Sequence, residues 1–349
     1  MSEFHTLTLS EVIKETPNSV VLSFDVPDSL VQTYEFIAGQ YLTIKHTIDG
    51  KEVRRAYSIC SAPKSEKLQV GIKKVDGGTF SVFANQQLKA GDTLDVMIPE
   101  GKFTLQPEKK AAKNYAAFVA GSGITPVISI IETVLREEPD SKFLLAYGNT
   151  TQLETMFHSR LLALSREFST RLEIEFLYSR ERTEEARFGR IDRSIVNLLL
   201  KNKFEFTVFD AFYLCGPEPM IDEVSSALKE QGINEKIIHF ELFTTSEEGM
   251  LVEAHDGNTE LTVTVDDETA TFTMEQGKTV LEATLANDMD APYSCQGGIC
   301  STCIARIVEG KAEMSKNQIL TDGEIADGLI LTCQAHPSTS KLVIDYDDV

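Results

Sequence analysis

Residues 293–303 read Tyr293-Ser-Cys-Gln-Gly-Gly-Ile-Cys-Ser-Thr-Cys303 and hold three of the six cysteines in the chain. A fourth, Cys333, follows far downstream, so the spacing is C-x4-C-x2-C-x29-C. A secreted disulfide framework requires a small, cysteine-dense chain, whereas this chain has 349 residues. Structural zinc sites use two separated pairs of ligands, which this spacing does not provide.

Three crowded cysteines followed by a distant fourth are typical of a plant-type [2Fe–2S] cluster. Gly297 and Gly298 permit unusual backbone angles, and the small neighbouring side chains allow backbone N–H groups to approach the sulfurs. A structural metal knuckle or a set of unrelated thiols is the alternative. We therefore predict four metal ligands: Cys295, Cys300, Cys303 and Cys333.

The segments around this loop predict a small α+β domain. Alternating residues predict strands at 261–265 and 269–273, a helix at 279–287, and further strands at 304–308 and 342–346. This order resembles the β-grasp fold of plant-type ferredoxins over residues 260–349, and the resemblance implies a cluster that carries single electrons.

Upstream, the first hundred residues contain short strands separated by turns, which predicts a small antiparallel β-barrel. One strand carries Arg55-Ala-Tyr-Ser58. This segment resembles the R-x-Y-S motif of the ferredoxin–NADP reductase family, which implies bound FAD. Arg55 would then make a bidentate contact with the pyrophosphate, and Tyr57 would pack against the flavin. Ser58 would reach the reactive edge of the flavin as a catalytic residue.

A second flavin element is Gly77-Gly-Thr-Phe-Ser81, which precedes a short helix expected from about Val82. Because N–H groups at a helix N-terminus bind phosphate, we expect Gly78, Thr79 and Ser81 at the FAD diphosphate, as the family resemblance implies. An ordinary turn with a helix cap is the alternative.

The middle of the chain alternates strands and helices, which predicts a parallel α/β sheet that binds NAD(P). A buried strand at 115–119, the loop Gly121-Ser-Gly-Ile-Thr-Pro126 and a helix at 127–135 form one βα unit. The loop resembles the G-x-G-x-T-P motif of ferredoxin reductases, which implies that Gly121, Gly123, Thr125 and Pro126 bind the pyrophosphate of NAD(P). Further strands are expected at 143–147, 174–178 and 211–214, and helices at 151–165, 192–200 and 219–231.

The ends of these strands hold the remaining candidates. Cys215 and Gly216, in Cys-Gly-Pro, resemble the family position beside the nicotinamide ring, with a buried packing residue as the alternative. Glu241 and Phe243 match the family's glutamate and aromatic near the flavin, and Cys215 and Glu241 are predicted to be catalytic. Ser179 and Arg180 lie where the family binds the 2′-phosphate, which favours NADPH over NADH. Cys60 is expected only to pack.

We expect an FAD-binding β-barrel at 1–108, an NAD(P)-binding domain at 109–245, a linker at 246–259 and the ferredoxin domain at 260–349. The net charge is −21, which argues against partners such as nucleic acid or anionic membranes. Residues 250–349 alone carry 18 acidic and 5 basic side chains, a net charge of −13, which suits a basic docking partner or simply a solvated surface. No secretory signal or membrane span is evident, so we expect a cytoplasmic protein.

This order of modules predicts a relay. A hydride donor and a one-electron cluster need flavin between them, because flavin can accept two electrons as a hydride and release them one at a time. The whole chain resembles the reductase components of phenylacetyl-CoA epoxidases, which implies an oxygenase partner, di-iron in type, acting on a CoA thioester. The alternatives are the reductase of another hydroxylase, monooxygenase or desaturase, and a carrier that does not itself oxidise NAD(P)H.

Overall fold

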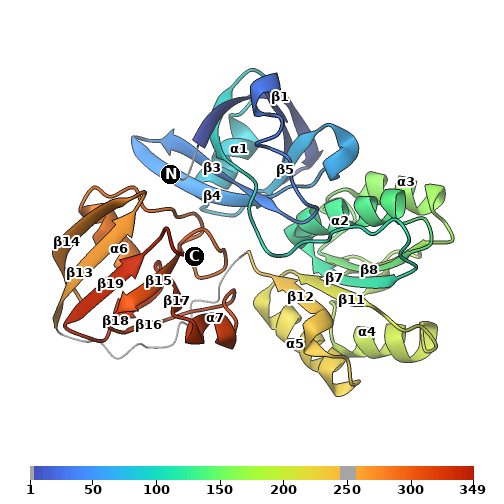
Figure 1. Cartoon of the computed structure of the whole chain (residues 1–349). Coiled ribbons are helices and arrows are strands. Elements are labelled where there is room, and N and C mark those ends of the chain that lie inside the picture. The colour runs from blue at the N-terminus through green and yellow to red at the C-terminus, as the bar shows by residue number, and fades with distance from the viewer. Residues whose placement is uncertain (1–3, 244–256) are drawn as a thin grey trace. The chain divides into compact units, whose positions relative to one another are not determined.

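The computed structural model describes residues 4–243 and 257–349, which form two compact units. Of the described residues, the main unit holds 5–53 and 57–243, and the C-terminal unit holds 257–349 together with Phe4 and the short segment 54–56. Most of the expected linker, 246–259, lies outside the described residues. Figure 1 shows the elements of both units along the chain.

The first part of the main unit is the predicted antiparallel barrel. Its six strands run in the order β4-β3-β6-β1-β2-β5, and a bridge between Ile59 and Val70 joins the two outer strands. Alternating apolar residues such as Leu22 and Ile44 fill its interior, and Phe80 of the single helix packs into the same core. The elements are β1 (Phe4–Thr16), β2 (Ser19–Asp25), β3 (Tyr41–Ile48), β4 (Lys51–Ser58), β5 (Leu68–Lys73), α1 (Thr79–Gln86) and β6 (Thr93–Met97).

The second part is a six-stranded parallel sheet in the order β10-β9-β8-β7-β11-β12. Helices α2 and α3 cover one face and α4 and α5 the other (Figure 1). The strands are β7 (Asn114–Ala120), β8 (Lys142–Asn149), β9 (Leu172–Tyr178), β10 (Arg187–Phe188), β11 (Ala211–Cys215) and β12 (Ile238–Glu241). The helices are α2 (Ile124–Glu137), α3 (His158–Glu167), α4 (Arg193–Asn197), continued by a π-helical turn at Leu198–Lys203, and α5 (Glu218–Glu230).

One hydrophobic core joins the barrel to the parallel sheet. Barrel side chains such as Val21 and Phe103 belong to the same buried cluster as Ile128 of α2 and Leu145 of β8. The two predicted domains of the main unit therefore share their interior.

The helix predicted at 151–165 begins later, at His158, so its expected start is wrong. The preceding residues are instead held by the barrel: the Asn18 amide donates to Glu154 (2.8 Å), and the Phe157 N–H donates to the Glu15 carboxylate (2.8 Å). Phe157 also adopts a left-handed φ of 58°, which ends any helix that would run through it.

The C-terminal unit has the α+β architecture expected from its sequence. A mixed sheet runs in the order β14-β13-β19-β15-β17, with β13 and β19 parallel, and a second pair is β16-β18. Thr279 caps α6 in a capping box with Glu282, so this helix starts where its sequence predicts. The elements are β13 (Asn258–Val265), β14 (Glu268–Glu275), α6 (Val280–Ala286), β15 (Ile304–Glu309), β16 (Ala312–Met314), α7 (Asp322–Ala326), β17 (Leu329–Leu331), β18 (Ala335–Pro337) and β19 (Lys341–Asp345).

The uncharged stretch Asn114–Ile131 divides into β7, a turn and the start of α2. Among the described residues, every helix is too short or too polar to span a bilayer.

Candidate redox site

The three predicted catalytic side chains come together in the main unit. The hydroxyl of Ser58, at the end of β4, donates to Glu241 Oε2 at 3.3 Å. Glu241 ends β12 and is paired in register with Cys215, the last residue of β11. All three are buried. Two neighbouring strand ends and one barrel strand thus place a hydroxyl, a carboxylate and a thiol at one point.

Burial determines the charge state of Cys215. Removal from water raises the pKa of its thiol well above the usual value, and the negative charge of Glu241 raises it further. The thiol therefore stays protonated and is a poor nucleophile. A small neutral group of this kind suits packing against a planar ring.

The glycine loop that follows β7 lies directly against Cys215. A Cβ atom added to Gly123 would lie 2.2 Å from the Cys215 carbonyl oxygen and 3.1 Å from its sulfur. Position 123 therefore has no room for a side chain. Gly121 has a φ of +57°, which favours glycine, and the loop leads through a 3₁₀ turn into α2.

Thr125 and Pro126 shape this loop from within. The Thr125 hydroxyl donates to the Ser122 carbonyl at 3.0 Å, and both Thr125 and Pro126 are buried in the first turn of α2. Their side chains hold the turn, while the backbone N–H groups at its start are the part suited to binding phosphate.

Two residues near this loop escaped the sequence reasoning. Tyr147, fully buried in β8, donates its hydroxyl to the Gly121 carbonyl at 2.9 Å. The ammonium of Lys73, at the end of β5, lies 3.8 Å from where a Gly121 Cβ would be. In the sequence, Tyr147 is an ordinary residue of a buried strand and Lys73 an ordinary surface lysine. Only the packing of the barrel against the parallel sheet shows that both lie beside Gly121.

The expected flavin elements adjoin α1. This helix begins at Thr79 rather than near Val82, and within the described residues no side chain caps its first turn. Its free N–H groups fit a phosphate. Ser81 is buried and its hydroxyl accepts the Val75 N–H (3.1 Å), so it secures the loop around Gly78.

Tyr57 of β4 contacts this helix directly: its ring centroid lies 5.6 Å from that of Phe80. Arg55, two residues earlier, is exposed, and its guanidinium donates to the Arg54 carbonyl at 2.7 Å. Phe243, beyond β12, is partly buried against the shared core. Gly216 packs against Ala120 and Met220, where a Cβ would lie 2.7 Å from Met220 Cε.

The end of β9 is held to the end of β8 by backbone bonds. The Ser179 N–H donates to the Asn149 carbonyl (3.0 Å), and the Arg180 N–H donates to the Thr150 carbonyl (2.9 Å). Nearby arginines are occupied: Arg182 lies over the Phe188 ring and Arg187 pairs with Glu175. The Arg180 side chain is exposed and has no ion pair among the described residues, so it is free to bind an anion.

In the C-terminal unit the four predicted ligands lie close together as free cysteines. Their thiols pair two by two, Cys295 with Cys300 and Cys303 with Cys333. A hydrogen bond from Cys300 lowers the pKa of Cys295 to about 7, although burial opposes this. The Gly297 N–H donates to the Cys295 sulfur at 3.3 Å, and Gly298 has a φ of +71°.

This arrangement fits a cluster of two irons. Within the described residues no three Cys, His or acidic side chains converge on a single ion. A [2Fe–2S] cluster instead needs two thiolates on each iron, which the two thiol pairs supply. N–H groups directed at the sulfurs stabilise a negative cluster.

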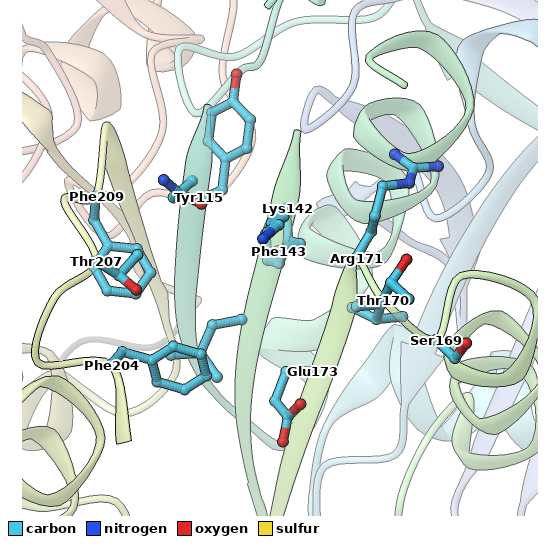
Figure 2. A pocket seen from close by; sticks show the side chains of 13 residues that line it. Tyr115, Lys142, Phe143, Ser169, Thr170, Arg171, Glu173, Phe204, Thr207 and Phe209 are labelled. Carbon is cyan, nitrogen blue, oxygen red and sulfur yellow. The ribbon is translucent and has the colours of Figure 1, made fainter. Parts of the chain in front are cut away.

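A separate pocket lies at the amino ends of the parallel strands, opposite the redox site (Figure 2). It has a volume of about 200 Å³ and is lined by the first residues of β7, β8 and β9, among them Asn114, Lys142 and Leu172, and by Phe204 and Phe209. Ligands of open α/β sheets bind at the carboxyl ends of strands, whereas this pocket lies at the amino ends. It is not part of the redox site.

Comparison with protein families recovers the same three parts in the same order. The oxidoreductase FAD-binding domain matches residues 6–105, the oxidoreductase NAD-binding domain residues 118–226, and the 2Fe-2S iron-sulfur cluster binding domain residues 263–338.

Whole-chain relatives carry these parts together. The chain is 38% identical to one of the subunits of 1,2-phenylacetyl-CoA epoxidase from Escherichia coli (strain K12), across 99% of both chains. It is 32% identical to the ferredoxin reductase component of 3-ketosteroid-9-alpha-monooxygenase from Rhodococcus rhodochrous, across 97% of this chain and 96% of that one. The chain belongs to this family of oxygenase reductases.

Solved structures of a reductase and of a monooxygenase share the fold. Phthalate dioxygenase reductase, described as a modular structure for electron transfer from pyridine nucleotides to [2Fe-2S], aligns with a TM-score of 0.61 at 22% identity and covers 98% of both chains. An intact type IV self-sufficient cytochrome P450 monooxygenase aligns with a TM-score of 0.70 at 22% identity, across 98% of this chain and 41% of that one.

As a member of the oxygenase reductase family, the chain is an NAD(P)H-dependent oxidoreductase that uses FAD and a [2Fe–2S] cluster. The predicted fold class and cofactors are thereby confirmed. Bound FAD would supply the chemistry that couples a two-electron hydride donor to a one-electron cluster. Ser58, Glu241 and Cys215 are all buried, so the point at which they meet is shielded from water.

Proposed function

We propose that this reductase supplies electrons to a di-iron oxygenase acting on a CoA thioester, and that this acceptor is the oxygenase of a phenylacetyl-CoA epoxidase. The observation that carries the proposal is the identity of 38% to a polypeptide of that enzyme, sustained across 99% of both chains. The reducing chemistry of the cluster and six free cysteines suit the cytoplasm.

Within the main unit, we propose that Cys215 packs against the nicotinamide while Ser58 and Glu241 contact the reactive edge of the flavin. The 3.3 Å bond between Ser58 and Glu241 supports this assignment, because it links a hydrogen-bond donor to a buried carboxylate. Arg55, Tyr57 and the start of α1 would hold FAD, with Phe243 near the ring.

For the nucleotide, we propose that the loop Gly121–Pro126 and Gly216 bind the diphosphate side, and that Ser179 and Arg180 bind the 2′-phosphate of NADPH. The exposed guanidinium of Arg180, which has no ion pair in the described part of the chain, supports NADPH as the preferred donor.

A second candidate acceptor is the oxygenase of a steroid hydroxylase system, which the identity of 32% to the 3-ketosteroid monooxygenase reductase favours. The electron-transfer motifs are shared by reductases of both kinds. A carrier that does not oxidise NAD(P)H would not need a nucleotide site, so the close contact between Gly123 and Cys215 argues against this alternative.

The deciding experiment is an anaerobic UV–visible titration of the reconstituted protein with NADPH and then NADH. We expect flavin absorbance to bleach first and cluster absorbance to fall next. Absence of any bleaching would favour the carrier. Product formation with purified phenylacetyl-CoA epoxidase oxygenase, compared with a ketosteroid oxygenase, then identifies the acceptor.

A further inference from the structure

Asn149, the last residue of β8, is a buried amide whose oxygen has no partner among the described residues. The residue is 8% exposed. Its Oδ1 atom makes no hydrogen bond with any part of the chain that the structure describes, whereas the amide interacts with the Tyr147 hydroxyl. A buried acceptor left unpaired is costly, so a native amide in this state indicates a missing partner.

The position of Asn149 indicates what that partner is. β8 lies between β7, which leads into the glycine loop, and β9, which ends at Ser179 and Arg180. The Asn149 amide also lies beside the Tyr147 hydroxyl, where it opposes the effect of burial that raises the pKa of Tyr147. That hydroxyl contacts the Gly121 carbonyl, so the amide sits alongside the loop.

A ligand that extends from the glycine loop to the end of β9 must pass over Asn149. For a pyridine nucleotide bound at both places, the intervening part is the adenosine ribose and its phosphate. A carboxamide matches this chemistry because it offers both a donor for a phosphate oxygen and an acceptor for a ribose hydroxyl.

We propose that Asn149 binds the adenosine ribose–phosphate portion of the pyridine nucleotide, an inference that rests on the nucleotide site proposed above. It gives the unpaired oxygen a partner. A core packing role does not, because an apolar side chain of similar size would fill the space without burying an unpaired polar atom.

The test compares Asn149→Leu with the unchanged protein, both loaded with FAD and cluster. Calorimetric titration uses ADP-ribose and NADP⁺ as probes. Loss of buried hydrogen bonds to the ligand should weaken both by about tenfold or more. The thermal midpoint without nucleotide should change little, since the free protein loses an unpaired buried oxygen together with one contact to Tyr147.

Asn197→Ala is the matched control. The Asn197 amide oxygen already accepts a hydrogen bond from Gln231 (3.2 Å), so this variant should leave nucleotide binding unchanged. Asn149→Asp keeps the size of the side chain and places a negative charge beside the phosphates, so it should weaken nucleotide binding further. This variant provides the test if Asn149→Leu does not fold. Unchanged affinities for ADP-ribose and NADP⁺ in the Asn149 variants overturn the inference alone. Failure of the unchanged protein to bind either probe overturns the proposed nucleotide site as well.

Discussion

Cys60 and Cys215 are both fully buried, and burial raises the pKa of each thiol, for Cys60 to about 12. The Cys60 sulfur donates to the Gln69 carbonyl at 3.4 Å, where the barrel closes. Neither thiol ionises in the folded protein near neutral pH. Cys60 thus acts in packing, as its sequence context predicts.

This protonation links stability to pH. An unfolded thiol ionises near pH 8.5, so above that value the unfolded chain has released a proton that folded Cys60 retains. The unfolded state is therefore favoured, and the free energy of unfolding should fall by about 1.4 kcal/mol per pH unit for this group. Cys60→Ala should reduce the slope between about pH 9 and 10.5 by that amount in denaturant titrations. An unaltered slope would contradict the assignment.

A second prediction at the scale of one residue concerns nucleotide choice. Arg180→Ala should raise KM for NADPH by about tenfold and leave KM for NADH within about twofold, because only NADPH carries the 2′-phosphate. Arg182→Ala is the control, since Arg182 already lies over the Phe188 ring. Steady-state kinetics with both donors measures the effect. An equal loss for NADPH and NADH would remove the assignment.

Helix α3 shows how one element depends on a distant one. Within the described residues its N-cap residue, Phe157, makes no side-chain cap, but the Phe157 N–H donates to the Glu15 carboxylate of β1 at 2.8 Å. A negative charge at a helix N-terminus also stabilises the helix by its interaction with the helix dipole. The barrel thus caps a helix of the nucleotide-binding part.

Glu15→Ala should therefore destabilise the main unit by about 1 kcal/mol, the usual value of a lost cap. Glu15→Gln retains an acceptor oxygen and should lose less. Glu11→Ala, an exposed glutamate on the same strand, should have no effect. Thermal unfolding followed by calorimetry orders the variants. Equal behaviour of Glu15→Ala and Glu11→Ala would show that the cap contributes nothing.

The contrast between α3 and α6 explains what the sequence could predict. The capping residues of α6, Thr279 and Glu282, lie three positions apart, so a local pattern reveals its start. The cap of α3 comes from Glu15, 142 positions away, so the local pattern predicts a start several residues early. The grouping of the four candidate ligand cysteines was likewise predictable from spacing, whereas the partners of Gly121 were not, because Tyr147 and Lys73 reach it from other strands.

At the scale of the molecule, charge is distributed unevenly. Residues 250–349 carry a net charge of −13, against −21 for the whole chain. Association of this acidic part with a basic acceptor should be accelerated by electrostatic attraction, which salt screens within about 10 Å at 0.1 M.

The rate of reduction of cytochrome c, a basic acceptor, should therefore fall as ionic strength rises from about 0.02 to 0.3 M, severalfold in all. Ferricyanide, an anion, is the control and should be reduced equally fast or faster at high salt. Stopped-flow measurement at constant NADPH tests both. Identical salt responses would mean that the acidic residues only solvate the surface.

The hydrophobic core shared by the barrel and the parallel sheet limits how this protein can be dissected. Val21 and Phe103 on one side and Ile128 and Leu145 on the other belong to one buried cluster, and the N-cap residue of α3 is held by Glu15 of β1. A fragment cut between the two parts would expose both halves of that core to water. The smallest piece that keeps the interior closed is therefore the complete pair, residues 5–243, which makes this pair the unit to exchange when reductases are recombined to build chimaeras.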